Sequence, residues 1–185
     1  MKDFWSENSK IIGKIILNQF GATFLGIMVI TAASSAQSQK AWLMLFASVF
    51  ASLFYLFLIY NVIWEKGGQD RIKIDGGRAA RKPLKGLMIS LVANIPNFIL
   101  ALIVLISNPF KETAAWAASL NVAGRALCLL WEGMYAGLVS YFSPHNPIIH
   151  LLYIFPALAV TTFGYILGLN NKRILSVFEL KQPKK

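Results

Sequence analysis

The sequence predicts an all-α integral membrane protein, a bundle with four membrane crossings plus one amphipathic helix that is interfacial or re-entrant. Three observations support this fold class. First, 56% of the 185 residues are hydrophobic and 14% are charged, whereas about a quarter of a soluble domain is charged. Second, four apolar segments reach about the 20 residues that a membrane-spanning helix needs. Third, most Lys and Arg residues lie in segments that flank these spans. No polar linker divides the chain, so we expect one domain, 1–185.

The first two predicted spans cover residues 15–36 and 41–64. A cleaved signal peptide is the alternative for the first, because Ser34-Ser35-Ala36 supplies small residues suited to cleavage. The second span has no charged residue, and aromatic residues near its ends are typical interface anchors. Small residues of the first span allow close helix packing, including against another subunit: Gly21, Ala22, Gly26, Ala32 and Ala33.

The third predicted span, 84–106, carries a proline near its middle. Pro96 has no amide hydrogen, so the helix is expected to kink there. Asn94 and Asn97 place amide groups at the same depth, and broken helices of this kind often form transporter sites. The alternative is a structural kink whose Asn side chains bond neighbouring helices. Pro156 predicts a second kink in the last span.

The segment 114–142 is predicted to be an amphipathic helix, with Arg125 and Glu132 seven residues apart on one side. Charged residues are costly at the centre of a membrane helix. If this segment crossed, the span 148–169 would also leave the basic C-terminal tail outside. The expected layout therefore has four crossings, with 114–142 lying along the outer surface or dipping in. If the segment is buried, Arg125 and Glu132 become candidates for a substrate pathway.

The loop 65–85 holds seven Lys or Arg residues and three acidic residues. Cytoplasmic loops are enriched in Lys and Arg, so this loop and both termini are expected in the cytoplasm. The cations flank hydrophobic spans without a nucleic-acid-binding motif, so we expect no nucleic acid partner. Candidate contacts to anionic lipid or to a protein partner are the basic residues of the loop: Arg71, Lys73, Arg78, Arg81, Lys82 and Lys85.

Within this loop, the pairs Gly67-Gly68 and Gly76-Gly77 predict turns. Two local ion pairs are also expected: Asp70 with Arg71, and Asp75 with Arg78. Three further carboxylates are expected to be ordinary solvated charges: Asp3, Glu7 and Glu179.

No enzyme motif is found, and no enzyme activity, cofactor or metal is expected. The segment from Asp75 to Arg81 superficially resembles the signature of CDP-alcohol phosphotransferases. However, Arg81 is one position late and no Asp follows Asp75, so the carboxylates that would hold divalent cations are missing. His145 and His150 are separated by a proline-containing turn, with no carboxylate or thiol near them in sequence, which argues against a metal site. Cys128 is the single cysteine.

Two function classes remain. The chain is predicted to be a small transporter or the membrane subunit of a transport system, with Asn94, Pro96, Asn97, Arg125 and Glu132 as candidates for the substrate pathway. The alternative is a non-catalytic accessory or scaffold protein that binds a partner or anionic lipid through its basic loop. Expected partners are the lipid bilayer and another membrane subunit or a second copy of the chain. The expected location is a bacterial cytoplasmic membrane.

Overall fold

The computed structural model describes residues 2–35, 41–142 and 146–173. The secondary structure of this part of the chain is helical, which confirms the predicted all-α fold class. The elements are α1 (Lys2–Ser35), α2 (Ala41–Asp75), α3 (Lys85–Ala93), α4 (Ile95–Ser107), η1 (Asn108–Phe110), α5 (Ala115–Trp131), η2 (Gly133–Tyr135), α6 (Ala136–Phe142), α7 (Ile149–Leu152) and α8 (Ile154–Leu169).

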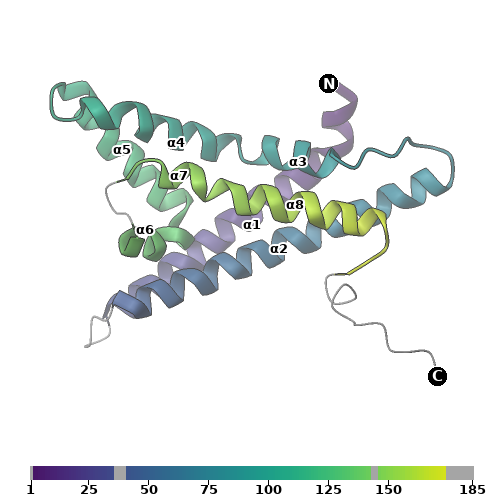
Figure 1. Ribbon diagram of the computed structural model, residues 1–185, viewed down its shortest axis with the longest axis horizontal. Helices are drawn as coiled ribbons and strands as arrows, with labels where there is room; N and C mark the ends of the chain where they lie inside the picture. The colour runs from purple at the N-terminus through teal and green to yellow at the C-terminus, as the bar shows by residue number, and fades with distance from the viewer. Residues whose placement is uncertain (1, 36–40, 143–145, 174–185) are drawn as a thin grey trace.

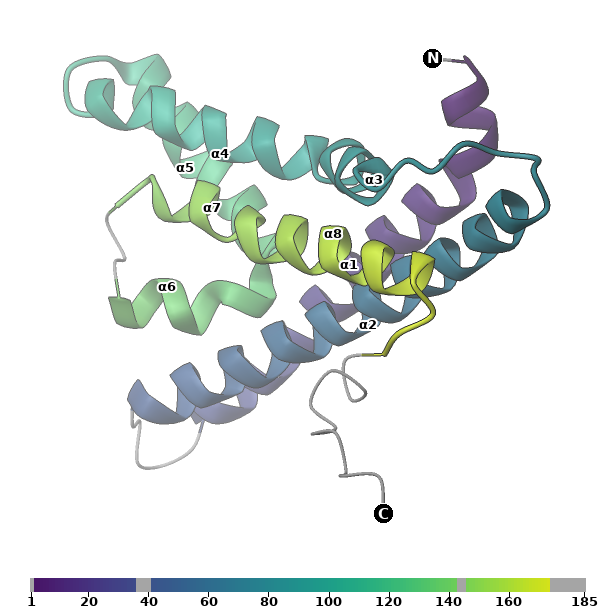
Figure 2. The ribbon, with the colours of Figure 1, turned by 45° about the vertical axis from the view of Figure 1, so that its right-hand side comes forward.

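Four segments run the length of the bundle in alternating directions: α1, α2, the pair α3–α4, and the pair α7–α8 (Figures 1 and 2). The start of α1, the loop after α2 and the end of α8 gather at one end, which we call the basic end. Side chains connect these parts: Arg81 Nη2 donates to Asn170 Oδ1 (2.8 Å), and Lys73 Nζ lies 3.3 Å from Glu7 Oε1. The end of α1, the end of α4 and the start of α7 lie at the opposite end.

The segment α5–α6 enters the bundle from the opposite end and returns to it (Figure 1). Its two helices are bent by 90° at Glu132, so the predicted continuous helix over 114–142 is wrong in its middle. Three helices have the length and hydropathy of a span, and counting both bent pairs as spans raises the number to five. Because α5–α6 returns to the end at which it starts, it fits the re-entrant alternative and leaves four crossings.

The structure corrects the prediction for the first half of the basic loop 65–85. Helix α2 continues to Asp75, so residues 65–75 are helical and Gly67-Gly68 is not a turn. A helix of this length extends about 50 Å, which exceeds the hydrocarbon thickness of about 30 Å. The second glycine pair does form a turn, as predicted, with Gly77 in the left-handed region at φ 69°. Asp75 pairs with Arg71 rather than Arg78.

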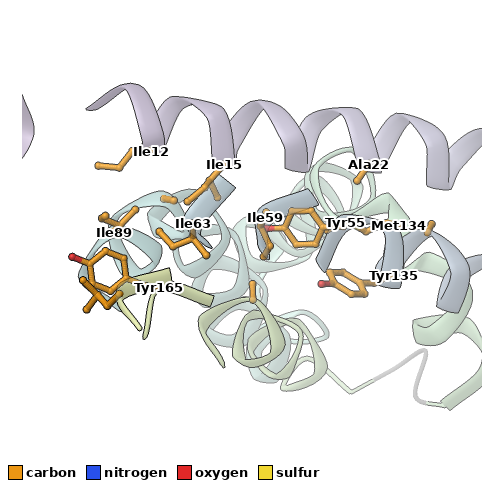
Figure 3. Close-up of a cluster of buried hydrophobic side chains, with 14 residues drawn as sticks. Ile12, Ile15, Ala22, Tyr55, Ile59, Ile63, Ile89, Met134, Tyr135 and Tyr165 are labelled. Carbon is orange, nitrogen blue, oxygen red and sulfur yellow. The ribbon is translucent and has the colours of Figure 1, made fainter. Parts of the chain in front are cut away.

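The core lies between α1, α2, α3 and α8, with η2 inserted at one side (Figure 3). Its largest fully buried side chains include Tyr55, Ile59 and Ile63 of α2 and Tyr165 of α8. Many large apolar side chains are exposed on the outside of the bundle, and the interior holds polar groups beside the apolar core. This arrangement is expected of a protein surrounded by lipid. Buried polar residues include Gln19, Thr23, Ser48, Ser90, Asn94, Asn97, Asn121 and Thr161.

Glycines allow the tightest contacts between helices. A Cβ atom at Gly168 would collide with the carbonyl oxygen of Trp64, and one at Gly67 would collide with the carbonyl oxygen of Tyr165. Backbone approach through small residues is the usual basis of helix packing in membranes. On α1, Gly26 similarly packs against the backbone of Met134. Part of the predicted small-residue surface therefore contacts the chain's own re-entrant segment.

Candidate functional site at the helix breaks

Two helix breaks meet inside the bundle, beside the residue that joins α7 to α8. The pair α3–α4 is bent by 54° at Asn94 and the pair α5–α6 by 90° at Glu132, while Tyr153 joins α7 to α8 within one span of 21 residues. All three residues line one closed interior space, together with Tyr55 and Tyr135, which has no room for a water molecule. Non-helical backbone at membrane depth is tolerated only where protein or a cavity surrounds it. The breaks therefore identify this interior as the candidate site.

The break at Asn94 has the predicted cause. Pro96 lies in the first turn of α4, where its missing amide hydrogen is tolerated. The amide of Asn94 still donates to the carbonyl oxygen of Ser90 at 2.9 Å, so α3 ends there with its last turn closed. Asn94 and Asn97 are both buried, as expected for side chains at the centre of the third crossing.

Asn97 connects three helices through its side chain. Gln19 Nε2 of α1 donates to Asn97 Oδ1 (2.7 Å), and Asn97 Nδ2 donates back to Gln19 Oε1 (3.2 Å). Asn97 Nδ2 also donates to Asn94 Oδ1 (2.7 Å), and the indole nitrogen of Trp131 in α5 donates to Asn97 Oδ1. For Asn97, the structure thus shows the hydrogen bonds to neighbouring helices that the alternative of a structural kink requires. Gln19 was absent from the sequence-based candidates.

Glu132 pairs with a histidine instead of an arginine. Its Oε2 atom lies 3.2 Å from Nδ1 of His150, and both residues are buried. Arg125 Nε donates to Asn121 Oδ1 (3.0 Å), and its Nη2 donates to Asn108 Oδ1 (3.2 Å), toward the end of α4. The shared helix face predicted for Arg125 and Glu132 nevertheless brings both to the wall of one cavity of about 140 Å³.

Cys128 completes a group of three buried ligand-type side chains. One potential ligand atom from each of Cys128, Glu132 and His150 lies within 4.8 Å of the other two. A histidine metal site was not expected, because no carboxylate or thiol lies near His145 or His150 in sequence. The fold brings a carboxylate and a thiol to His150 across 18 or more positions. His145 lies outside the described residues.

Several buried oxygens around this group have no hydrogen-bond partner among the described residues: Glu132 Oε1, the Tyr55 hydroxyl and the Tyr135 hydroxyl. Figure 3 shows the rings of Tyr55 and Tyr135 next to each other, beside Met134, and all three residues line the same closed space. The ring of Tyr135 stacks on that of Tyr153 with centroids 4.5 Å apart. Unpartnered buried polar atoms are costly. Glu132 and Tyr135 also line the cavity of about 140 Å³, so their free oxygens indicate a place for a polar ligand there.

A second polar cluster lies at the basic end. Asp70 accepts from Lys66 (2.7 Å), Lys85 (2.8 Å) and the Tyr165 hydroxyl (2.9 Å). The expected Asp70–Arg71 pair is therefore wrong. Glu7, expected to be simply solvated, lies 2.9 Å from Lys85 and contacts two further lysines. This network holds α1, α2, α3 and α8 together.

The network also separates the predicted basic contact residues into two groups. Lys85, Lys73 and Arg71 form ion pairs within the protein. Three others are exposed in the loop before α3: Arg78, Arg81 and Lys82.

Comparison with known proteins adds no assignment. A scan against protein-family models and searches of curated proteins and of solved structures found no match to this chain. The integral membrane character follows from the hydrophobic helices. Function is therefore argued from the geometry of the site.

Proposed function

We propose that this polytopic membrane protein is a transporter that carries a small cation through the cavity of about 140 Å³ beside the two helix breaks. The observation that carries the proposal is the convergence of these breaks on buried polar atoms without partners. Transporters commonly bind ions where helices are interrupted near the middle of the membrane. The protein has no catalytic role in this proposal.

The groups around the space favour a positively charged ligand. Glu132 has one carboxylate oxygen without a partner, and the hydroxyl oxygens of Tyr55 and Tyr135 add two more acceptors. A buried carboxylate is costly unless a partner compensates its charge. His150 contacts Oε2 of Glu132, so a bound cation has the free Oε1 available or takes the place of this hydrogen bond between Oε2 and Nδ1.

Uptake into liposomes tests this proposal. Purified protein is reconstituted, Na⁺, K⁺, Mg²⁺ and Zn²⁺ are offered in turn, and a trapped ion-sensitive dye reports uptake. We expect uptake of one cation above that of empty liposomes, and its loss in Glu132→Gln. Glu112→Gln is the matched control, because Glu112 is an exposed carboxylate outside the site. Absence of uptake for all four cations would contradict the proposal.

A second candidate role is contact with anionic lipid at the basic end. Arg81 and Lys82 line a cavity of about 570 Å³ together with the carboxylate of Glu7 and apolar side chains. These apolar side chains include Phe4, Leu84 and Met88. A phosphate headgroup beside the cations and an acyl chain along the apolar wall fit this arrangement. Such contacts contribute about 1 kcal/mol per basic residue near an anionic surface.

Thermal unfolding in lipid nanodiscs tests the second role. The wild type is expected to unfold at a higher temperature in phosphatidylglycerol than in phosphatidylcholine. The double variant Arg81→Gln/Lys82→Gln should lose most of that difference. Lys111→Gln, at the opposite end, should keep it. Equal unfolding temperatures of the wild type in both lipids would contradict the role.

A further inference from the structure

The thiol of Cys128, the carboxylate of Glu132 and the imidazole of His150 form one compact, buried group. They come from the last turn of α5, the break after it, and α7. One carboxylate oxygen, Oε1 of Glu132, has no partner. The cavity of about 140 Å³ adjoins all three residues. The group therefore combines three ligand types with room for a bound species.

We propose that these three side chains bind a Zn²⁺-class transition-metal ion, with the cavity supplying the fourth coordination position. Zn²⁺ takes Cys, His and Glu ligands, with an open position in sites that exchange ligands. Hard cations such as Mg²⁺ and Ca²⁺ prefer all-oxygen sites. A thiol and an imidazole therefore select against them.

The distances suit a shared ion. Tetrahedral coordination at ordinary Zn–N and Zn–O distances separates the two ligand atoms by about 3.3 Å, and Nδ1 of His150 lies 3.2 Å from Oε2 of Glu132. The Cys128 sulfur lies within 4.8 Å of a ring nitrogen of His150 and of a carboxylate oxygen of Glu132, so an approach of at most about 1 Å completes a three-ligand site. Binding releases the thiol proton to solvent, and the proton of the Nδ1–Oε2 hydrogen bond moves to Nε2 of His150, which frees Nδ1 and Oε2 for the ion. The thiolate and carboxylate charges then balance the two charges of the ion.

This inference names the ligand class of the proposed transport site, so its physiological role rests on the proposed function. Binding itself does not depend on transport. Metal binding is measured in detergent and cation uptake is measured in liposomes, so either result can be negative without the other. Bound metal without uptake would remove the transport role and keep the site. Uptake of Na⁺ or K⁺ without metal binding would remove the metal site and keep transport.

Cobalt substitution tests the site directly. Protein purified without a polyhistidine tag is titrated with Co²⁺, and a thiolate-to-cobalt charge-transfer band is expected in the near ultraviolet. Cys128 is the single cysteine of the chain, so such a band has one possible source. Zn²⁺ added in equal amount should abolish the band, because Zn²⁺ binds nitrogen and sulfur ligands more tightly than Co²⁺.

Three variants and one control complete the experiment. Cys128→Ser should lose the band, and Glu132→Gln and His150→Gln should each weaken Co²⁺ binding by more than about tenfold, the lower bound for losing even an outer-shell partner. Glu112→Gln should match the wild type. Circular dichroism and gel filtration verify that each variant is folded. The absence of a band in folded wild-type protein would overturn the inference, as would unchanged affinity in folded His150→Gln.

Discussion

Oε2 of Glu132 lies 3.2 Å from Nδ1 of His150, although 18 positions separate the two residues. Glu132 sits where α5 ends, and His150 lies in the short helix α7. Their contact ties the deepest point of the re-entrant segment to the start of the last crossing. It is also the pair around which the unpartnered oxygens of the site gather.

Removing His150 should destabilise the protein through Glu132. In His150→Gln the carboxylate stays buried without its partner, and breaking a buried pair in this way costs about 3 kcal/mol. The double variant Glu132→Gln/His150→Gln should recover much of that loss, because no buried charge remains. Chemical unfolding in detergent micelles measures the free energies. Strictly additive effects of the two substitutions would contradict the pairing.

Asn97→Leu should lower the free energy of unfolding by about 2 kcal/mol. The substitution removes bonds to Gln19, Asn94 and Trp131, and single hydrogen bonds between membrane helices contribute about 0.6 kcal/mol on average. Asn61→Leu is the matched control, since Asn61 is exposed and its side chain donates to the carbonyl oxygen of Phe57 in its own helix. An equal effect of the two substitutions would argue against the connecting role of Asn97.

Gly168→Ala should disrupt the contact between α2 and α8. The new methyl group would collide with the backbone of Trp64 and Gly67, and overpacking of this kind costs about 1–3 kcal/mol. Gly68→Ala has open space around its Cβ position and should be neutral or stabilising by up to about 1 kcal/mol. Unfolding measurements on both variants test the packing. A stable Gly168→Ala protein would mean that the helices lie further apart.

Asp70→Asn should be far more harmful than Asp75→Asn. Asp70 is buried with Lys66, and losing its charge leaves that lysine poorly compensated, at a cost of about 3 kcal/mol. Asp75 pairs with Arg71 on the exposed surface, where such pairs contribute less than about 1 kcal/mol. Thermal unfolding of the two variants in detergent gives the comparison. Similar losses in both would show that the Asp70 network is not buried.

The four-crossing arrangement predicts which residues share a membrane face. Single cysteines at Arg78, Lys111 and Asn170 in a Cys128→Ser background are labelled with a membrane-impermeant maleimide in oriented vesicles. Positions 78 and 170 should label from one face, which we expect to be cytoplasmic, and position 111 from the other. Labelling of 78 and 170 from opposite faces would require α5–α6 to cross the membrane.

Local features of the fold were predictable from local sequence. The kink at Asn94 follows from Pro96, whose missing amide hydrogen acts within one turn. The turn at Gly77 follows from the pair Gly76-Gly77. The limits of α2 were not predictable in this way, because Gly67-Gly68 normally indicates a turn. Its helical state depends on packing against α8, which lies a hundred residues further along the chain.

The candidate site was only half visible in the sequence. Periodicity placed Arg125 and Glu132 on one face, and the nearby Pro96 drew attention to Asn97. The partners of Glu132 and Asn97 were not predicted, because Gln19 and His150 come from other crossings. Hydrophobic patterns specify which face of a helix is buried, but they carry no register between helices.

The sequence by itself determined that this is a helical membrane protein, where its apolar spans lie and where one of them breaks. Those properties depend on hydrophobicity and on backbone chemistry within a few residues. Only the tertiary structure decided that α5–α6 turns back, that Glu7 joins the Asp70 network and that Glu132 meets His150. These contacts depend on how tightly and at what register the helices pack, and the glycines that permit such packing act only when their partners are in place.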